Sequence, residues 1–143
     1  MFINGQRLLE HTCVKELSET EVVSLEDYAE ALVAASHAIY KEQIYTLNDF
    51  FTVEEWTSKK TIRLAQELNC ENALKAALSL NRKIRLGLVE APYKIPLPLW
   101  LVMLVEKFRI DNLTRATSID MLKALTNKRV GKLLKSKLTR ETY

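Results

Sequence analysis

The sequence predicts an all-α fold: a single-domain helical bundle of about six or seven helices over residues 1–143. The chain length suits one domain with its own core. Only three glycines and three prolines occur in 143 residues, too few for the many turns of a β-sandwich or barrel. Apolar residues also recur at spacings of three and four, as on a helix face. The same scarcity of glycine argues against a glycine-rich phosphate loop.

The first half of the chain predicts two helices in succession. Residues 5–16 form a short amphipathic helix, with Leu8 and Leu9 inward. Ser24 followed by Asp27 resembles a capping box that opens the next helix. Two neighbouring apolar stripes on that helix predict that it contacts other helices on two sides, inside a bundle. His37 lies on the second stripe and is interpreted as a hydrogen-bonded core histidine. The stripes are Leu25, Tyr28, Leu32, Ala35 and Ile39, and Val33, His37, Tyr40 and Ile44.

Two further helices are expected before the main loop. Asn48-Asp49 is predicted to break the preceding helix, and Thr52 with Glu55 forms a stronger capping box. The helix that it opens ends near residue 69. Residues 71–86 form the next helix, and Gly87 is its expected stop. Residues 88–97 are predicted to be a loop because they contain Pro92 and Pro96.

The longest uncharged apolar run, residues 95–105, predicts the central buried helix, which begins at Pro98 and ends near Ile110. Eleven residues are too few to span a bilayer, which needs about 20. A membrane-surface helix over residues 130–138 is disfavoured because it lacks the tryptophan or phenylalanine that such helices bury, so no membrane partner is expected. Short helices are predicted over residues 118–125 and 128–138, with a turn at 126–127. The predicted core contains Leu32, Ile39, Trp56, Leu78, Trp100, Leu104 and Leu133.

The charge of the chain is divided unequally. Residues 1–69 hold six basic and twelve acidic residues, whereas residues 70–143 hold fifteen basic and six acidic ones. Such an asymmetry predicts a polyanion or an acidic protein as the partner of the second half, unless the two halves neutralise each other. Two cysteines make no disulfide framework, and the first residues contain no secretory signal. A cytoplasmic location is therefore expected.

No metal, cofactor or catalytic site is predicted. His11 and Cys13 would project about 200° apart on a helix, so they cannot share an ion. None of the common nucleophile, zinc-protease or phosphate-loop motifs occurs. The acid pairs at residues 26–27 and 54–55 lie at predicted helix starts, where they complement the helix dipole. The sequence therefore predicts a protein that is not an enzyme.

Basic residues on two later helices are the predicted binding site. Like charges along one helix face destabilise an isolated helix, which favours a partner that neutralises them, and phosphate is the commonest such partner. Lysine dominates the last helix and acts as a point charge rather than as a fork that reads bases. We therefore expect binding to a nucleic-acid backbone, DNA or RNA, with little sequence preference. The candidate residues are Lys75, Arg82, Lys83, Arg85, Lys128, Arg129, Lys132 and Lys135.

Two other interpretations remain open. Residues 118–138 have helix–turn–helix proportions, and a recognition helix would present Asn127, Lys128 and Arg129 to base edges. The chain could instead be a protein–protein adaptor whose basic end meets an acidic protein. Binding of single strands at several salt concentrations separates the adaptor from the nucleic-acid subunit.

Basic stripes on later helices, an acidic first half and the lack of a catalytic set resemble the small helical subunits of CRISPR Cascade-type effector complexes. The resemblance covers the architecture of the whole chain. It implies a non-catalytic subunit of a ribonucleoprotein complex in antiviral defence, whose basic faces contact nucleic acid, including the displaced DNA strand. It also implies that the acidic region 16–30, with five glutamates and one aspartate, faces neighbouring protein subunits.

Overall fold

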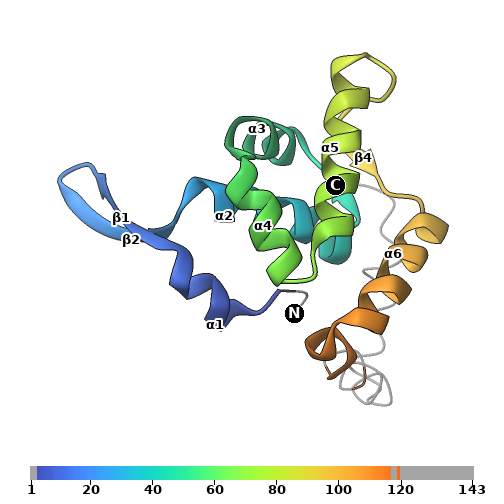
Figure 1. The fold of residues 1–143 in the computed structure, drawn as a ribbon. Helices are drawn as coiled ribbons and strands as arrows, with labels where there is room; N and C mark the ends of the chain where they lie inside the picture. Colours follow the sequence, from blue (N-terminus) through green and yellow to red (C-terminus); the bar gives the residue numbers. More distant parts are fainter. Residues whose placement is uncertain (1–2, 117–118, 120–143) are drawn as a thin grey trace, which may run out of the picture.

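The computed structural model describes residues 3–116 and residue 119, and these are mostly helical (Figure 1). The predicted helical class is confirmed in this coarse form, but two small antiparallel sheets accompany the helices. A short helix over residues 112–116 follows the last named element. In chain order the elements are α1 (Gly5–Leu8), the 3-10 turn η1 (Leu9–His11), β1 (Thr12–Leu17), β2 (Thr20–Leu25), α2 (Asp27–Ser36), the π-helical turn η2 (His37–Glu42), β3 (Ile44–Tyr45), α3 (Leu47–Trp56), α4 (Lys59–Glu67), α5 (Glu71–Arg85), β4 (Tyr93–Lys94) and α6 (Leu97–Ile110).

The predicted helix over residues 5–16 is wrong beyond its first turns, because β1 and β2 form a hairpin that projects from the helical body (Figure 1). Val14 faces Val23 across the ladder, and β-branched residues suit such a pleated surface. The turn residues Ser18 and Glu19 both have positive φ, 48° and 67°. This geometry is that of a type I′ turn, which normally uses asparagine or glycine. The two turn residues of the hairpin therefore lack the sequence pattern that usually predicts such a turn.

Helix α2 begins later than the sequence predicts. Ser24 belongs to β2, and Glu26 precedes the helix without a capping side chain, so the predicted box at 24–27 is wrong. The helix runs into η2, which ends at Gln43 with φ of 58°. Leu32 is fully buried, as expected. His37 is instead exposed, beside Lys41, so it is not a core histidine.

Helix α3 begins where a break was expected. Asp49 accepts hydrogen bonds from the backbone nitrogen of Thr46 at 2.8 Å and from its hydroxyl at 2.6 Å, which makes a complete capping box. The predicted box at Thr52 is wrong, because Thr52 lies inside this helix. Ser58 caps the following helix α4 with Thr61. The chain therefore turns at residues 57–58 rather than at 48–49.

Helix α5 and its stop match the prediction closely. The backbone nitrogens of Gly87 and Leu88 donate to the carbonyl oxygens of Ile84 and Lys83, both at 2.9 Å. Gly87 has φ of 66°, so this is a Schellman motif that needs the freedom of glycine. The predicted loop follows, and within it β4 pairs with β3 through Tyr93 and Tyr45.

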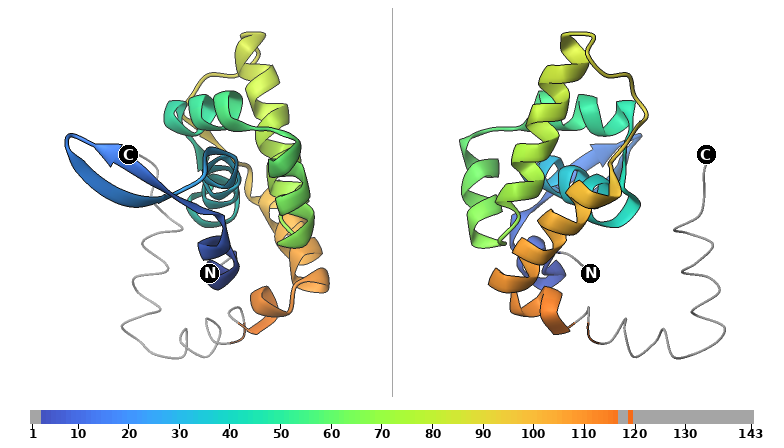
Figure 2. Two further views of the ribbon diagram at one scale, coloured as in Figure 1. Left: turned by 60° about the vertical axis from the view of Figure 1, so that its left-hand side comes forward. Right: turned by 90° about the vertical axis from the view of Figure 1, so that its right-hand side faces the viewer.

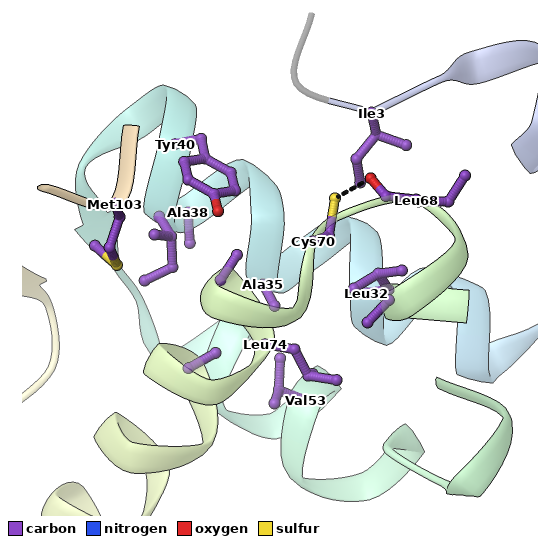
Figure 3. Close-up of a cluster of buried hydrophobic side chains, with 14 of the residues drawn as sticks. Ile3, Leu32, Ala35, Ala38, Tyr40, Val53, Leu68, Cys70, Leu74 and Met103 are labelled. Atoms are coloured by element: carbon purple, nitrogen blue, oxygen red, sulfur yellow. Dashed lines mark hydrogen bonds between the residues drawn. The ribbon is translucent and has the colours of Figure 1, made fainter. Parts of the chain in front are cut away.

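The core lies between α2, η2, α3, α4 and α5, with α6 on its outside (Figures 2 and 3). Leu32 and Ile39 are fully buried, as expected. Trp56, Trp100 and Leu104 are only half-buried. Leu78 is exposed, so its assignment to the core is wrong. It lies one position after the buried Ala77 and turns away with the polar side of α5. The predicted core residue Leu133 and the predicted elements at 118–125, 126–127 and 128–138 lie outside the described residues.

Candidate functional site

The four candidate residues on α5 are all exposed; Arg82, Lys83 and Arg85 lie in its last turn, and Lys75 lies nearer its start. Lys75 and Arg82 are seven residues apart, nearly two full turns, so they share one side of the helix. Lys83 flanks Arg82 in the last turn. Neither Lys75, Arg82 nor Lys83 makes an ion pair with another described residue. Their charges are therefore available to a partner from outside.

Arg85 differs from the other three, because it forms an ion pair with Glu54 of α3. Glu54 also accepts a hydrogen bond from the amide of Asn81 at 3.0 Å. Asn81 is buried and in turn accepts from the hydroxyl of Tyr45 at 2.6 Å. Arg85 thus belongs to a polar network that fastens α5 to α3, and it is the least available of the four.

The other half of the predicted site lies outside the described residues. Lys128, Arg129, Lys132 and Lys135 belong to this unplaced part of the chain, as does the whole helix–turn–helix candidate at residues 118–138. The structure therefore places the α5 residues together and leaves the second basic group as a sequence prediction.

The acidic region 16–30 falls into two parts. At the hairpin tip, Glu16 directly faces Glu21 across the ladder, and like charges in this position destabilise a hairpin. Nearer the body, Asp27 pairs with Lys15 at 2.6 Å and Glu26 with Lys60 at 3.9 Å. The tip therefore carries exposed carboxylates, Glu16, Glu19 and Glu21, that make no ion pair with another described residue.

A hollow of about 480 Å³ lies at the base of the hairpin. Lys15 crosses it, with its nitrogen 5.6 Å from the centre of the Trp56 ring. The hydrogen bond to Asp27 raises the pKa of Lys15, so the amine stays charged and paired. Two of the carboxylates in the hollow, Asp27 and Glu26, are held in ion pairs with Lys15 and Lys60, whereas the third, Glu55, is exposed. The hollow is lined by Cys13, Lys15, Glu26, Asp27, Tyr28, Glu55, Trp56 and Ser58.

Over residues 3–116 and 119, no group of three or more histidine, cysteine or acidic side chains is arranged to hold a metal ion. His11 bonds the hydroxyl of Tyr28 through Nδ1 at 2.8 Å. Within the same range, no helix has the length and apolar content needed to cross a membrane.

The expectation that the run 95–105 is the central buried helix is wrong. Of the residues in α6, only Met103 and Lys107 are buried. Four apolar side chains spaced by four, four and three form one line along the outer side, which we call the outer stripe. Its members are Leu97, Leu101, Val105 and Phe108, and they are 52%, 45%, 48% and 39% exposed.

Lys107 is a buried, fully paired lysine that the sequence analysis did not single out. Its side chain is 1% exposed, and its amine donates to the carbonyl oxygen of Asn69 at 2.9 Å. Asp111 lies 3.1 Å from the amine, one helical turn away, and Tyr40 presents its ring at 5.4 Å. Cys70 lies at 3.4 Å; burial raises the pKa of that thiol although Lys107 opposes the shift.

The Lys107 network explains how α6 is oriented. The lysine binds the carbonyl group at the end of α4, where helix carbonyls lack internal partners. The one sequence signal for this role is the spacing of Lys107 and Asp111, which suits an ion pair on one helix face. The network holds α6 by a polar anchor and turns its apolar residues outward.

Comparison of the chain with protein-family models, with curated proteins and with solved structures gives no match in any of the three.

Proposed function

We propose that the protein is a non-catalytic helical subunit that binds nucleic-acid backbone without strong sequence preference, within a larger ribonucleoprotein complex. The observation that carries the proposal is the set of exposed cations on α5, Lys75, Arg82 and Lys83, which have no ion-pair partner among the described residues. The resemblance to the small subunit of Cascade-type complexes supports the same role.

The chemistry of this surface favours phosphate over bases. Adjacent cations on α5 repel one another, and a bound polyanion neutralises this repulsion. Binding also releases the counterions that were condensed on the nucleic acid. Helix α5 contains no aromatic residue, so it offers no platform on which bases could stack. Contacts from single lysines and arginines to phosphates position a protein without reading sequence.

The acidic tip of the hairpin supports a second surface for neighbouring subunits. Glu16, Glu19 and Glu21 are exposed there, away from α5. A basic protein surface would relieve the repulsion between Glu16 and Glu21.

A protein–protein adaptor is the second candidate function. The ion pair between Arg85 and Glu54 within the chain supports it, because a carboxylate already lies against this end of α5. An acidic protein could therefore bind the same cations that we assign to phosphate.

Fluorescence anisotropy of a labelled single strand tests the proposal. The Arg82→Ala/Lys83→Ala variant should weaken binding about equally on unrelated sequences. It should reduce the log–log salt slope by up to about 1.4, since each phosphate contact contributes about 0.7 on single strands. The matched control is Lys59→Ala/Arg63→Ala, which removes one lysine and one arginine from exposed positions on α4 and should leave binding almost unchanged.

A second variant examines the cations outside the described residues. Lys128→Ala/Lys132→Ala/Lys135→Ala should reduce the slope by up to about three contacts' worth. Loss of affinity for one sequence alone would favour the helix–turn–helix interpretation of residues 118–138. No saturable binding at low salt would contradict the nucleic-acid proposal and favour the adaptor.

A further inference from the structure

We propose that residues 128–138 dock as an amphipathic helix onto the outer stripe of α6. The inference concerns the placement of this segment and does not depend on nucleic-acid binding. The outer stripe is an apolar line on a helix that is anchored by a buried lysine. Val102 extends the apolar area on one flank and is 56% exposed. Contiguous exposed apolar surface of this kind marks a binding face.

The sequence of the segment is complementary to that face. In a helix over residues 128–138, Val130, Leu133, Leu134 and Leu138 fall on one side. Lys128, Lys132 and Lys135 fall on the opposite side. Such a helix would therefore bury its leucines against α6 and keep its lysines in water.

The chain can reach this position without strain. Helix α6 has 14 residues and is about 21 Å long, whereas eleven residues make a helix of about 17 Å. Residues 112–116 and 119 are helical and lie beyond the C-terminal end of α6 (Figures 1 and 2). The eight residues 120–127 span about 12 Å even as a continuous helix and up to about 26 Å when extended. This length allows the segment to turn back and run antiparallel along α6.

Residues 128–138 of the same chain are a better occupant of the outer stripe than a second copy of the chain. A short tether holds the segment at an effective concentration on the order of millimolar, far above the usual concentration of another molecule. Docking would also place the lysines of residues 128–135 outward, where a polyanion can reach them.

The test measures the reactivity of a cysteine placed in the outer stripe of the full chain. Val105→Cys is the reporter, and Lys75→Cys on the exposed side of α5 is the reference. Both carry Cys13→Ser, because Cys13 is half-buried, whereas Cys70 is fully buried. A maleimide reagent should label Val105→Cys at least about tenfold more slowly than Lys75→Cys, because a covered thiol reacts only when the segment opens.

Two variants of the segment provide the comparison. Leu133→Ser/Leu134→Ser should bring the labelling rate of Val105→Cys up to that of the reference. Lys132→Ser/Lys135→Ser changes neighbouring positions to the same residue and should leave the slow rate unchanged. Circular dichroism checks the helical content of each protein, and Leu101→Cys replaces Val105→Cys as the reporter if the latter does not fold.

Three results would overturn the proposal. The first is fast labelling of Val105→Cys in the otherwise unaltered chain, since the stripe would then be uncovered. The second is slow labelling that Leu133→Ser/Leu134→Ser does not accelerate, which would mean that another element covers α6. The third is protection that falls on dilution, which would assign the stripe to a second copy.

Discussion

Helices α5 and α6 are nearly equal in length, 15 and 14 residues, but they are built in opposite ways. Helix α5 buries alanine and leucine side chains and exposes its cations. Helix α6 buries Lys107 and exposes leucine, valine and phenylalanine side chains. In α5, burial of the apolar side determines the orientation of the helix. In α6, the buried Lys107 shares this role with the core residue Met103 and with Trp100, whose indole nitrogen donates to the carbonyl oxygen of Tyr40 at 3.1 Å.

This contrast shows what orients a helix that is apolar on every side. Such a helix has no strongly preferred inward face, so a few polar contacts, those of Lys107 and Trp100, help to fix which side is buried. A lysine can be buried only where several acceptors surround it. The carbonyl of Asn69 and the carboxylate of Asp111 provide them for Lys107. The remaining apolar surface of α6 is then left for another partner.

Removal of the Lys107 amine should have the largest effect. Lys107→Ala should lower the free energy of unfolding by about 3–5 kcal/mol, because a buried ion pair is broken and Asp111 loses its partner. Lys75→Ala on α5 should change it by less than about 0.5 kcal/mol, since Lys75 is exposed. Urea denaturation of both proteins measures the difference. Equal stability of the two variants would mean that Lys107 does not anchor α6.

Leucine-to-alanine changes should affect the two helices differently. Leu74 on α5 is 3% exposed, and Leu74→Ala should cost about 2–5 kcal/mol. Leu99 on α6 is half exposed and lies away from the outer stripe, so Leu99→Ala should cost less than about 1 kcal/mol. Thermal unfolding of the two variants compares them. A larger cost for Leu99→Ala would show that the flank of α6 is part of a core.

The sequence could predict α5 because its signals are local. Its apolar residues recur with one helical period, and Gly87 supplies the stop within the next turn. The exposure of Lys75, Arg82 and Lys83 follows from the same periodicity. The pairing of Arg85 could not be predicted, because Glu54 lies 31 residues away on another helix.

The orientation of α6 and the hairpin could not be predicted for two different reasons. An apolar run without periodicity contains no information about which side is buried, and the carbonyl acceptors of Lys107 come from a distant turn at residues 68–69. The hairpin lacks the asparagine or glycine that usually marks a two-residue turn, because Ser18 and Glu19 adopt positive φ instead.

The anchor should also make stability depend on pH. Burial alone would raise the pKa of Asp111, but hydrogen bonds from Thr114 and Lys107 outweigh it, so the pKa lies below its ordinary value of 3.8. A lowered carboxyl pKa contributes stability above the unfolded value, which is lost as the pH falls through the folded value. Asp111→Asn should therefore be less stable than the parent at pH 7, by about 1–3 kcal/mol.

The stability difference between parent and Asp111→Asn should shrink as the pH falls below about 4, because the parent carboxylate becomes protonated. Denaturant titrations at a series of pH values measure it, and Glu90→Gln, at an exposed carboxylate, is the control. A difference that stays constant down to pH 2 would show that the Asp111 charge does not stabilise the anchor.

Hydroxyl-radical footprinting of the unaltered chain, read by mass spectrometry, tests most directly whether the outer stripe of α6 is covered. The rates for Leu97, Leu101, Val105 and Phe108 are normalised to the intrinsic reactivity of each residue type. Leu86 and Leu88, which are 62% and 71% exposed after α5, are the references. We predict that the stripe residues are oxidised several times more slowly than the references and that Leu99 is not protected. Oxidation of the stripe at the rate of Leu86 and Leu88 would contradict the account.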